Sequence, residues 1–154
     1  MLNTSNISLK IQDTLNRTKI LKAKDCKLWL AELATKKSFI TIRIVSESES
    51  AELNKRYRKI DKPTNILSFL IEGSPLIGDL ILCHPIIKEE AKEQNKEIIS
   101  HYAHLVIHGY LHLLGYDHEN DKESIKMEAK EIEVLSRLGF PNPYTSNYNL
   151  INEK

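Results

Sequence analysis

The sequence predicts an α+β fold in one domain, with a mixed sheet of about four strands and about five helices packed against it. Its 154 residues, of which 28% are charged and 41% hydrophobic, are typical of one globular domain. Segments with a period of two residues occur between segments of helical period. These segments follow one another in the order β, α, β, α, β, β, α, α, α. The domain is expected to span 1–154, with a polar, flexible tail over 145–154.

The first half of the chain is expected to contain two strands, each followed by a helix. Residues 6–12 alternate Ile and Leu with polar side chains and predict a short strand. Residues 24–36 place apolar side chains at helical spacing, with Asp25 as the predicted N-cap. Residues 39–45 alternate strictly and are rich in β-branched side chains, so they predict a strand. Serines with capping chemistry precede a helix over about 49–58.

The second half begins with a predicted hairpin and continues with three helices. Strands over 65–71 and 77–82 are joined by a Gly-Ser-Pro turn, and Pro85 fits the first turn of the next helix, which extends through Gln94. Residues 97–114 predict a long helix whose apolar positions cover most of its circumference, which implies burial in the middle of the domain. The last amphipathic helix is expected over 120–138, with an apolar face made of Ile125, Ala129, Ile132 and Leu135.

Charge and cysteine content limit the possible partners and the compartment. Residues 1–82 carry 14 Lys and Arg against 9 Asp and Glu, and residues 83–154 carry 8 against 12, so a basic face for a polyanion is not excluded by the net charge of +1. Two cysteines 57 positions apart, Cys26 and Cys83, form no disulfide framework and fit a cytoplasmic protein with reduced thiols. No signal peptide and no apolar run of membrane-spanning length is visible, so no membrane partner is expected.

Histidines concentrate in one stretch, residues 108–118. His108 and His112 are four apart, so on a helix they share one face. Gly115 can end that helix in a left-handed conformation and turn the chain back, which brings His118 to the same point. Three imidazoles with one open coordination position are typical of a catalytic zinc site, with one ion per chain.

This histidine spacing matches that of the metzincin peptidases, with one informative difference. Those enzymes carry Glu directly after the first histidine as general base, and this chain has Gly109. Met127 lies inside a predicted helix, so no Met-turn is evident. The metal frame is thus predicted without the base of a peptidase.

Two neighbours of the histidine stretch are candidates for supporting roles. His104 precedes His108 by four residues and is expected to lie in the core or to orient a ligand. Asp117 is expected either to orient a ligand imidazole, as carboxylates beside metal sites do, or to stabilise the turn. His101, three residues before His104, is expected to be partly exposed.

A basic segment over 55–62 holds five Lys and Arg residues around one tyrosine. It is compatible with a solvated helix face. It is equally compatible with a patch that binds phosphates, because Lys provides a point charge and Arg provides paired donors.

Three motifs, LNKRYRKIDKPTNILSF, IGDLIL and HGYLHLLGYDH, in this order and spacing, resemble the YbeY family of bacterial endoribonucleases. The resemblance implies a single α+β domain that binds one zinc ion through His108, His112 and His118. It also implies that Arg58 lies in the cleft near the metal and takes part in catalysis. The implied substrate is single-stranded RNA in ribosomal RNA maturation, especially at the 3′ end of the 16S RNA, and in ribosome quality control.

Further expectations follow from this resemblance. The ribosomal small subunit is the expected partner, in the cytoplasm, and no DNA substrate is expected. Lys55, Arg56 and Lys59 are expected to hold the RNA strand. One departure is Asn65, where the family more often has Asp.

Two alternatives stay open: a zinc hydrolase of another class, such as a peptidase, and a ribosome-associated RNA-binding protein whose metal is mainly structural.

Overall fold

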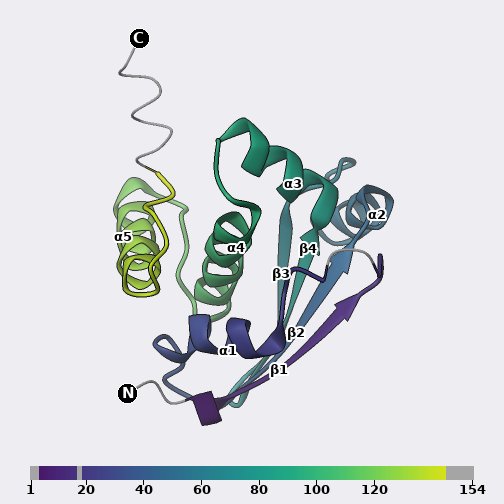
Figure 1. Ribbon diagram of the computed structural model, residues 1–154. Coiled ribbons are helices and arrows are strands. Elements are labelled where there is room, and N and C mark those ends of the chain that lie inside the picture. Colours follow the sequence, from purple (N-terminus) through teal and green to yellow (C-terminus); the bar gives the residue numbers. More distant parts are fainter. Residues whose placement is uncertain (1–3, 17–18, 145–154) are drawn as a thin grey trace.

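A mixed four-stranded sheet forms the centre of the computed structural model, which describes residues 4–16 and 19–144 (Figure 1). The strand order is β1-β2-β4-β3, and the predicted tail over 145–154 lies outside the described residues. Three strands run parallel to one another, β1 (Ile7–Asp13), β2 (Ser38–Val45) and β4 (Leu76–Cys83). The edge strand β3 (Ile66–Gly73) pairs antiparallel with β4, which confirms the predicted hairpin.

Within the described part of the chain, five α-helices accompany the sheet, and this confirms the predicted α+β class. They are α1 (Ala23–Ala31), α2 (Glu47–Arg58), α3 (His84–Glu93), α4 (Ile98–Leu113) and α5 (Asp121–Arg137). A short 3₁₀ turn, η1 (Thr4–Asn6), precedes β1. No helix of the described residues is long and apolar enough to cross a bilayer.

Local capping explains where two of the helices begin. The Ser46 hydroxyl accepts a hydrogen bond from the Glu49 backbone N–H at 3.2 Å, so α2 begins at Glu47, two residues earlier than predicted. The predicted N-cap of α1 is wrong: Asp25 lies in the first turn, and the capping position belongs to Lys22, which makes no side-chain cap. This helix also ends at Ala31 rather than at residue 36, and the Leu33 N–H closes a tighter turn onto the Leu30 carbonyl at 3.0 Å.

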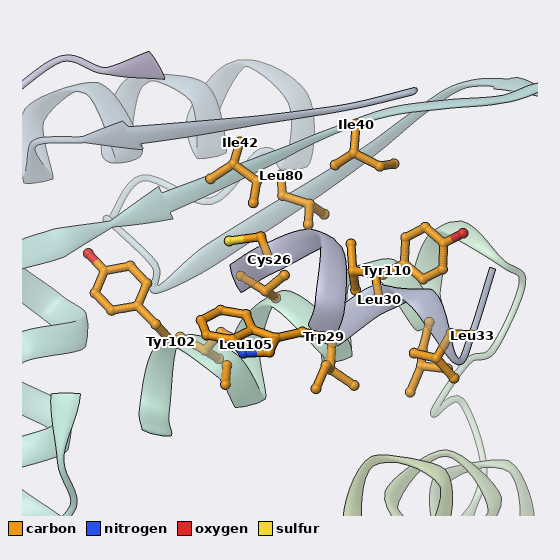
Figure 2. Close-up of a cluster of buried hydrophobic side chains, with 14 of the residues drawn as sticks. Cys26, Trp29, Leu30, Leu33, Ile40, Ile42, Leu80, Tyr102, Leu105 and Tyr110 are labelled. Carbon is orange, nitrogen blue, oxygen red and sulfur yellow. The ribbon is translucent and has the colours of Figure 1, made fainter. Parts of the chain in front are cut away.

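Helix α4 is buried between other elements, as predicted, and carries ten buried residues out of 16. Its apolar side chains meet those of α1 and of the sheet in one core. Figure 2 shows this cluster, in which the labelled side chains come from α1 (Cys26, Trp29, Leu30), the segment after it (Leu33), α4 (Tyr102, Leu105, Tyr110) and the sheet (Ile40, Ile42, Leu80). A helix fixed on so many sides is a rigid support for the histidines near its C-terminal end.

Helix α5 lies beside α4 and buries a face that agrees only in part with the predicted one (Figure 1). Ile125 is 68% exposed and Ala129 is also exposed. Leu135 is buried, as predicted, and Ile132 is half-buried. The other buried side chains are Met127, Glu131 and Val134. The physical reason is the acid among them: rotating α5 to bury Ile125 would withdraw the Glu131 carboxylate from its histidine partners on α4.

Candidate functional site

The three histidines of the 108–118 stretch meet at one point. The imidazole Nε2 atoms of His108 and His112 are 3.1 Å apart. The ring of His118 lies 4.9 Å from that of His112 and 6.0 Å from that of His108, measured between centroids. One potential ligand atom from each residue lies within 4.8 Å of the others, so the cluster has the dimensions of a metal site.

Gly115 ends α4 and turns the chain as the sequence predicts. Its φ of +104° is one that other residues rarely adopt. Its N–H bonds the carbonyl of His112 at 3.0 Å, and the N–H of Tyr116 bonds the carbonyl of Leu111 at 3.0 Å. These two bonds form a Schellman motif, which reverses the chain so that His118 returns toward the helix.

Hydrogen bonds at the other ring nitrogens fix the tautomers of two of these histidines. His112 Nδ1 lies 3.1 Å from the Tyr116 carbonyl oxygen, and His108 Nδ1 lies 3.2 Å from a carboxylate oxygen of Glu131. Both partners can only accept, so each Nδ1 carries the proton and each Nε2 of a neutral ring carries a lone pair.

Two facing lone pairs repel unless a cation lies between them. The Nε2 separation of 3.1 Å is close to the edge of a tetrahedral zinc site, which is about 3.3 Å for Zn–N bonds of 2.0–2.1 Å. The donor set therefore fits a metal ion such as zinc.

The electrostatics of the site keep His112 and Glu131 in the forms that favour a nearby cation. Burial, together with the nearby rings of His108 and His118, lowers the pKa of His112, which leaves its ring neutral at neutral pH. Burial also opposes ionisation of Glu131, but hydrogen bonds from His104 and His108 outweigh it and lower the carboxyl pKa to about 2. The site thus contains a neutral His112 ring and a permanent negative charge on Glu131.

A second group of potential ligands overlaps the first. His104, His108 and Glu131 also place one potential ligand atom each within 4.8 Å of one another. Here the atoms face each other as hydrogen-bond partners, since His104 Nε2 lies 2.9 Å from Glu131. This group therefore already has an explanation without an ion.

Gly109 packs against the sheet, and a side chain at this position would require the ends of Ile66 and Leu80 to shift. A Cβ atom there would lie 2.8 Å from Ile66 Cδ1, 2.8 Å from Leu80 Cδ2 and 3.0 Å from Ser68 Oγ. A glutamate in the position of the peptidase base would therefore have to displace packed side chains of the sheet.

An open cleft of about 520 Å³ joins the histidine cluster to the segment between α2 and β3. Arg58, the last residue of α2, lines this cleft with its side chain. Its Nη2 donates to the Ser68 carbonyl at 2.9 Å, and its guanidinium lies 4.9 Å from the centroid of the Phe69 ring. Residues lining the cleft are Arg58, Asn65, Ile66, Leu67, Ser68, Leu70, His108, His112 and His118.

Charge compensation distinguishes Arg58 from its neighbours on α2. Arg56 pairs with Glu52 at 3.0 Å, and Lys55 lies 3.9 Å from Asp61. Within residues 4–16 and 19–144, no carboxylate lies at ion-pair distance from Arg58. Its positive charge is therefore available to an anion in the cleft.

The other predicted basic residues lie outside the cleft. Lys55, Arg56 and Lys59 are all exposed near the end of α2, and none of them lines the cleft. Lys59 adopts a left-handed conformation, with φ of +63°, where the helix ends.

The side-chain amide of Asn65 is held by a chain of hydrogen bonds that passes through Glu90 to His101. Its Nδ2 donates to Glu90 at 3.0 Å, and Glu90 also lies 2.8 Å from His101 Nε2. His101 is 3% exposed, so the expectation that it is partly exposed is wrong: its partner Glu90 satisfies it in the interior. Because Nδ2 is held by Glu90, the amide oxygen is the atom of Asn65 left for contacts in the cleft.

The candidates for supporting roles make contacts that the sequence did not specify. An oxygen of Asp117 accepts the backbone N–H of its neighbour His118 at 2.7 Å, which is turn chemistry. His104 bonds Glu131 rather than a ring of the cluster. The contacts that orient His108 and His112 come from Glu131 and from the Tyr116 carbonyl.

Glu131 is the residue of the site that the sequence analysis missed. It is fully buried on α5, 23 positions after His108. Met127 lies four residues before it and Leu135 four residues after it, both buried. An acid within an apolar stripe of helical spacing was the signal that pointed to a buried, paired carboxylate.

Fold and site together define a class of protein: an α+β domain with a three-histidine cluster and an uncompensated arginine in one open cleft, suited to a metal ion and an anionic substrate. Comparison with known proteins gives the family. The family model described as "Endoribonuclease YbeY" matches residues 3–139, so the chain belongs to the YbeY endoribonuclease family. The resemblance predicted from the sequence motifs is thereby confirmed.

Individual relatives agree with this assignment. A protein of Alteromonas mediterranea named Endoribonuclease YbeY is 50% identical over 113 residues, covering 70% of this chain and 72% of its own. One of Colwellia psychrerythraea with the same name is 45% identical over 148 residues, covering 88% and 96%. The solution structure of TM1509 from Thermotoga maritima matches with a TM-score of 0.60 at 29% identity, covering 85% of this chain and 91% of that chain.

Proposed function

We propose that the chain is a zinc-dependent endoribonuclease specific for single-stranded RNA. It acts in ribosomal RNA maturation at the 3′ end of the 16S RNA and in ribosome quality control, with the small ribosomal subunit as partner in the cytoplasm. The observation that carries the metal dependence is the 3.1 Å approach of two ring nitrogens whose lone pairs face each other. Family membership supports the RNA substrate, and two unpaired, buried thiols fit the cytoplasm.

His108, His112 and His118 are the proposed zinc ligands, one ion per chain. A bound zinc ion would lower the pKa of a water ligand to about 7 and would polarise a phosphoryl oxygen. The protein contributes fixed ring orientations, through Glu131 and the Tyr116 carbonyl, and an open side toward the cleft.

Arg58 is the proposed catalytic arginine. Phosphodiester cleavage builds negative charge on the phosphoryl oxygens, and a guanidinium without an acidic partner stabilises that charge. One N–H of Arg58 is bonded to Ser68, which orients the group and leaves its other donors for the phosphate.

Outside the cleft, Lys55, Arg56 and Lys59 are proposed to bind flanking phosphates of the RNA strand. All three are exposed, and the ion pairs that two of them make are on the surface and therefore weak. Their contribution would weaken strongly with added salt, as phosphate contacts do.

Two other functions remain to be tested against this one. A zinc peptidase would need a general base, which Gly109 does not supply, and a side chain there would have to displace Ile66 and Leu80. A ribosome-associated RNA-binding protein with a structural metal would bind RNA without cutting it, but structural zinc sites have four protein ligands and this cluster has three.

The test compares the parent with His118→Ala and with Glu119→Ala. Both residues are exposed neighbours, so neither change should unfold the protein. Each protein is incubated with zinc and a labelled single-stranded RNA, the DNA of the same sequence, duplex RNA, a 16S precursor RNA, or casein. Cleavage of the single-stranded RNA by the parent and Glu119→Ala, lost in His118→Ala and on chelation, is the expected result. RNA binding without cleavage by any of the three proteins would favour the structural metal, and casein cleavage would favour the peptidase.

A further inference from the structure

A buried carboxylate on α5 gathers three side-chain donors. Glu131 is 0% exposed, and its oxygens lie 2.7 Å from the Tyr144 hydroxyl, 2.9 Å from His104 Nε2 and 3.2 Å from His108 Nδ1. Only one of these donors belongs to the histidine cluster. The other two hold the carboxylate in the orientation in which it meets His108.

Tyr144 reaches this position from the segment that follows α5. This segment, drawn in yellow in Figure 1, runs back along α5. The side chain of Asn142 accepts the backbone N–H of Tyr144 at 2.8 Å, and Pro143 between them is buried. The Tyr144 ring meets His104 edge to face, with centroids 5.5 Å apart and an interplanar angle of 82°. Local turn chemistry and packing on α4 thus aim the hydroxyl at Glu131.

We propose that Tyr144 is a positioning residue for the metal ligand His108, acting through Glu131, and that cation binding and docking of residues 140–144 are therefore coupled. Without the hydroxyl, the carboxylate loses its shortest hydrogen bond and gains rotational freedom. The proton on His108 Nδ1, and with it the direction of the Nε2 lone pair, is then less firmly held. The inference rests on the proposed metal site.

Coupling between the two events is reciprocal. If a docked Tyr144 raises the affinity for a cation, a bound cation stabilises the docked segment by the same factor. Removing a residue that hydrogen-bonds a metal ligand directly typically weakens metal affinity by about 10–100-fold. Tyr144 acts through one further hydrogen bond, so we expect Tyr144→Phe to weaken the affinity for a cation by about 3–10-fold.

In the experiment, the full-length, metal-free protein is titrated with Co²⁺, whose absorption reports the ligand geometry. Zn²⁺ is then added to displace the bound Co²⁺, which gives the affinity for Zn²⁺. The variants are Tyr144→Phe, Glu131→Gln and Tyr102→Phe. Tyr102 is the matched control, because it is a fully buried tyrosine of α4 whose hydroxyl bonds His84 at 2.6 Å instead of the site. Hydrogen exchange of the Tyr144 amide is followed with and without the cation.

The expected result is weaker cation binding by Tyr144→Phe, still weaker binding by Glu131→Gln, and parental affinity in Tyr102→Phe. The cation should also slow exchange of the Tyr144 amide in the parent. Equal affinities of Tyr144→Phe and Tyr102→Phe, with no cation effect on exchange, would overturn the coupling and leave the metal site intact. A parent that binds no cation would overturn the metal site itself.

Discussion

The glycine after the first cluster histidine separates this site from that of a zinc peptidase, and it can be tested by Gly109→Glu. The first carbon of any side chain there approaches Ile66 and Leu80 to 2.8 Å and Ser68 to 3.0 Å. Overpacking costs about 1–3 kcal/mol, and desolvating a polar group without a partner costs about 1–3 kcal/mol more. The higher helix propensity of glutamate than of glycine adds less than about 1 kcal/mol to the unfolding free energy. The net loss of unfolding free energy is therefore about 3 kcal/mol.

Thermal unfolding of the metal-free protein measures this loss. A domain of this size loses roughly 2–4 °C in Tm per kcal/mol, so Gly109→Glu should lower Tm by roughly 6–12 °C. The matched control is Gly73→Glu, since a Cβ at Gly73 meets nothing within 4 Å and the residue is exposed. Its Tm should stay within about 2 °C of the parent, as surface substitutions usually do. If Gly109→Glu were as stable as this control, or cleaved casein, the steric exclusion of a peptidase base would be refuted.

Three further outcomes follow from the described contacts. Gly115→Ala should lower the unfolding free energy by about 1–2 kcal/mol, because alanine is strained at a φ of +104°. Denaturant unfolding measures this loss, and an unchanged denaturant midpoint would contradict the turn geometry. Asn65→Asp replaces a donor to Glu90 by a second carboxylate, so the unfolding free energy should fall by about 1–2 kcal/mol at pH 7 and by less at pH 4. A loss of unfolding free energy that did not depend on pH would argue against repulsion between the two carboxylates. Burial lowers the pKa of His104 and His112, so the unfolded chain binds more protons below pH about 6.5. The metal-free protein should therefore lose stability as pH falls from 7 to 5, and a urea midpoint that did not fall would contradict this.

Local patterns predicted the helices and strands well because each depends on neighbouring residues. The hairpin, the buried helix α4 and the Gly115 turn are all encoded in short stretches of sequence. The face of α5 was predicted only in part, since Leu135 is buried but Ile125 is exposed. Hydrophobicity favours burying Ile125, but hydrogen bonds to residues far away in sequence favour burying Glu131, and these tertiary contacts determine the rotation of the helix.

The same distinction applies within the site. The spacing of His108, His112 and His118 was sufficient to bring them together, because one helix and one turn contain all three. The cleft that joins Arg58 to them depends on how β3 pairs with β4, which the sequence of α2 cannot specify. The hydrogen-bond partners of the rings, Glu131 and the Tyr116 carbonyl, were likewise invisible to a spacing argument.

Strand β3 connects the two halves of the site. Its Ser68 carbonyl and Phe69 ring hold Arg58, while Ile66 and the Ser68 side chain contact α4 at Gly109. Because both contacts are on one short strand, the distance between the arginine and the histidine cluster is set by the sheet rather than by the exposed end of α2. The cluster itself is held by α4 and α5, without Arg58. It follows that affinity for a cation and stabilisation of a bound phosphate are separable properties of this site, one built on helices and the other on the edge of the sheet.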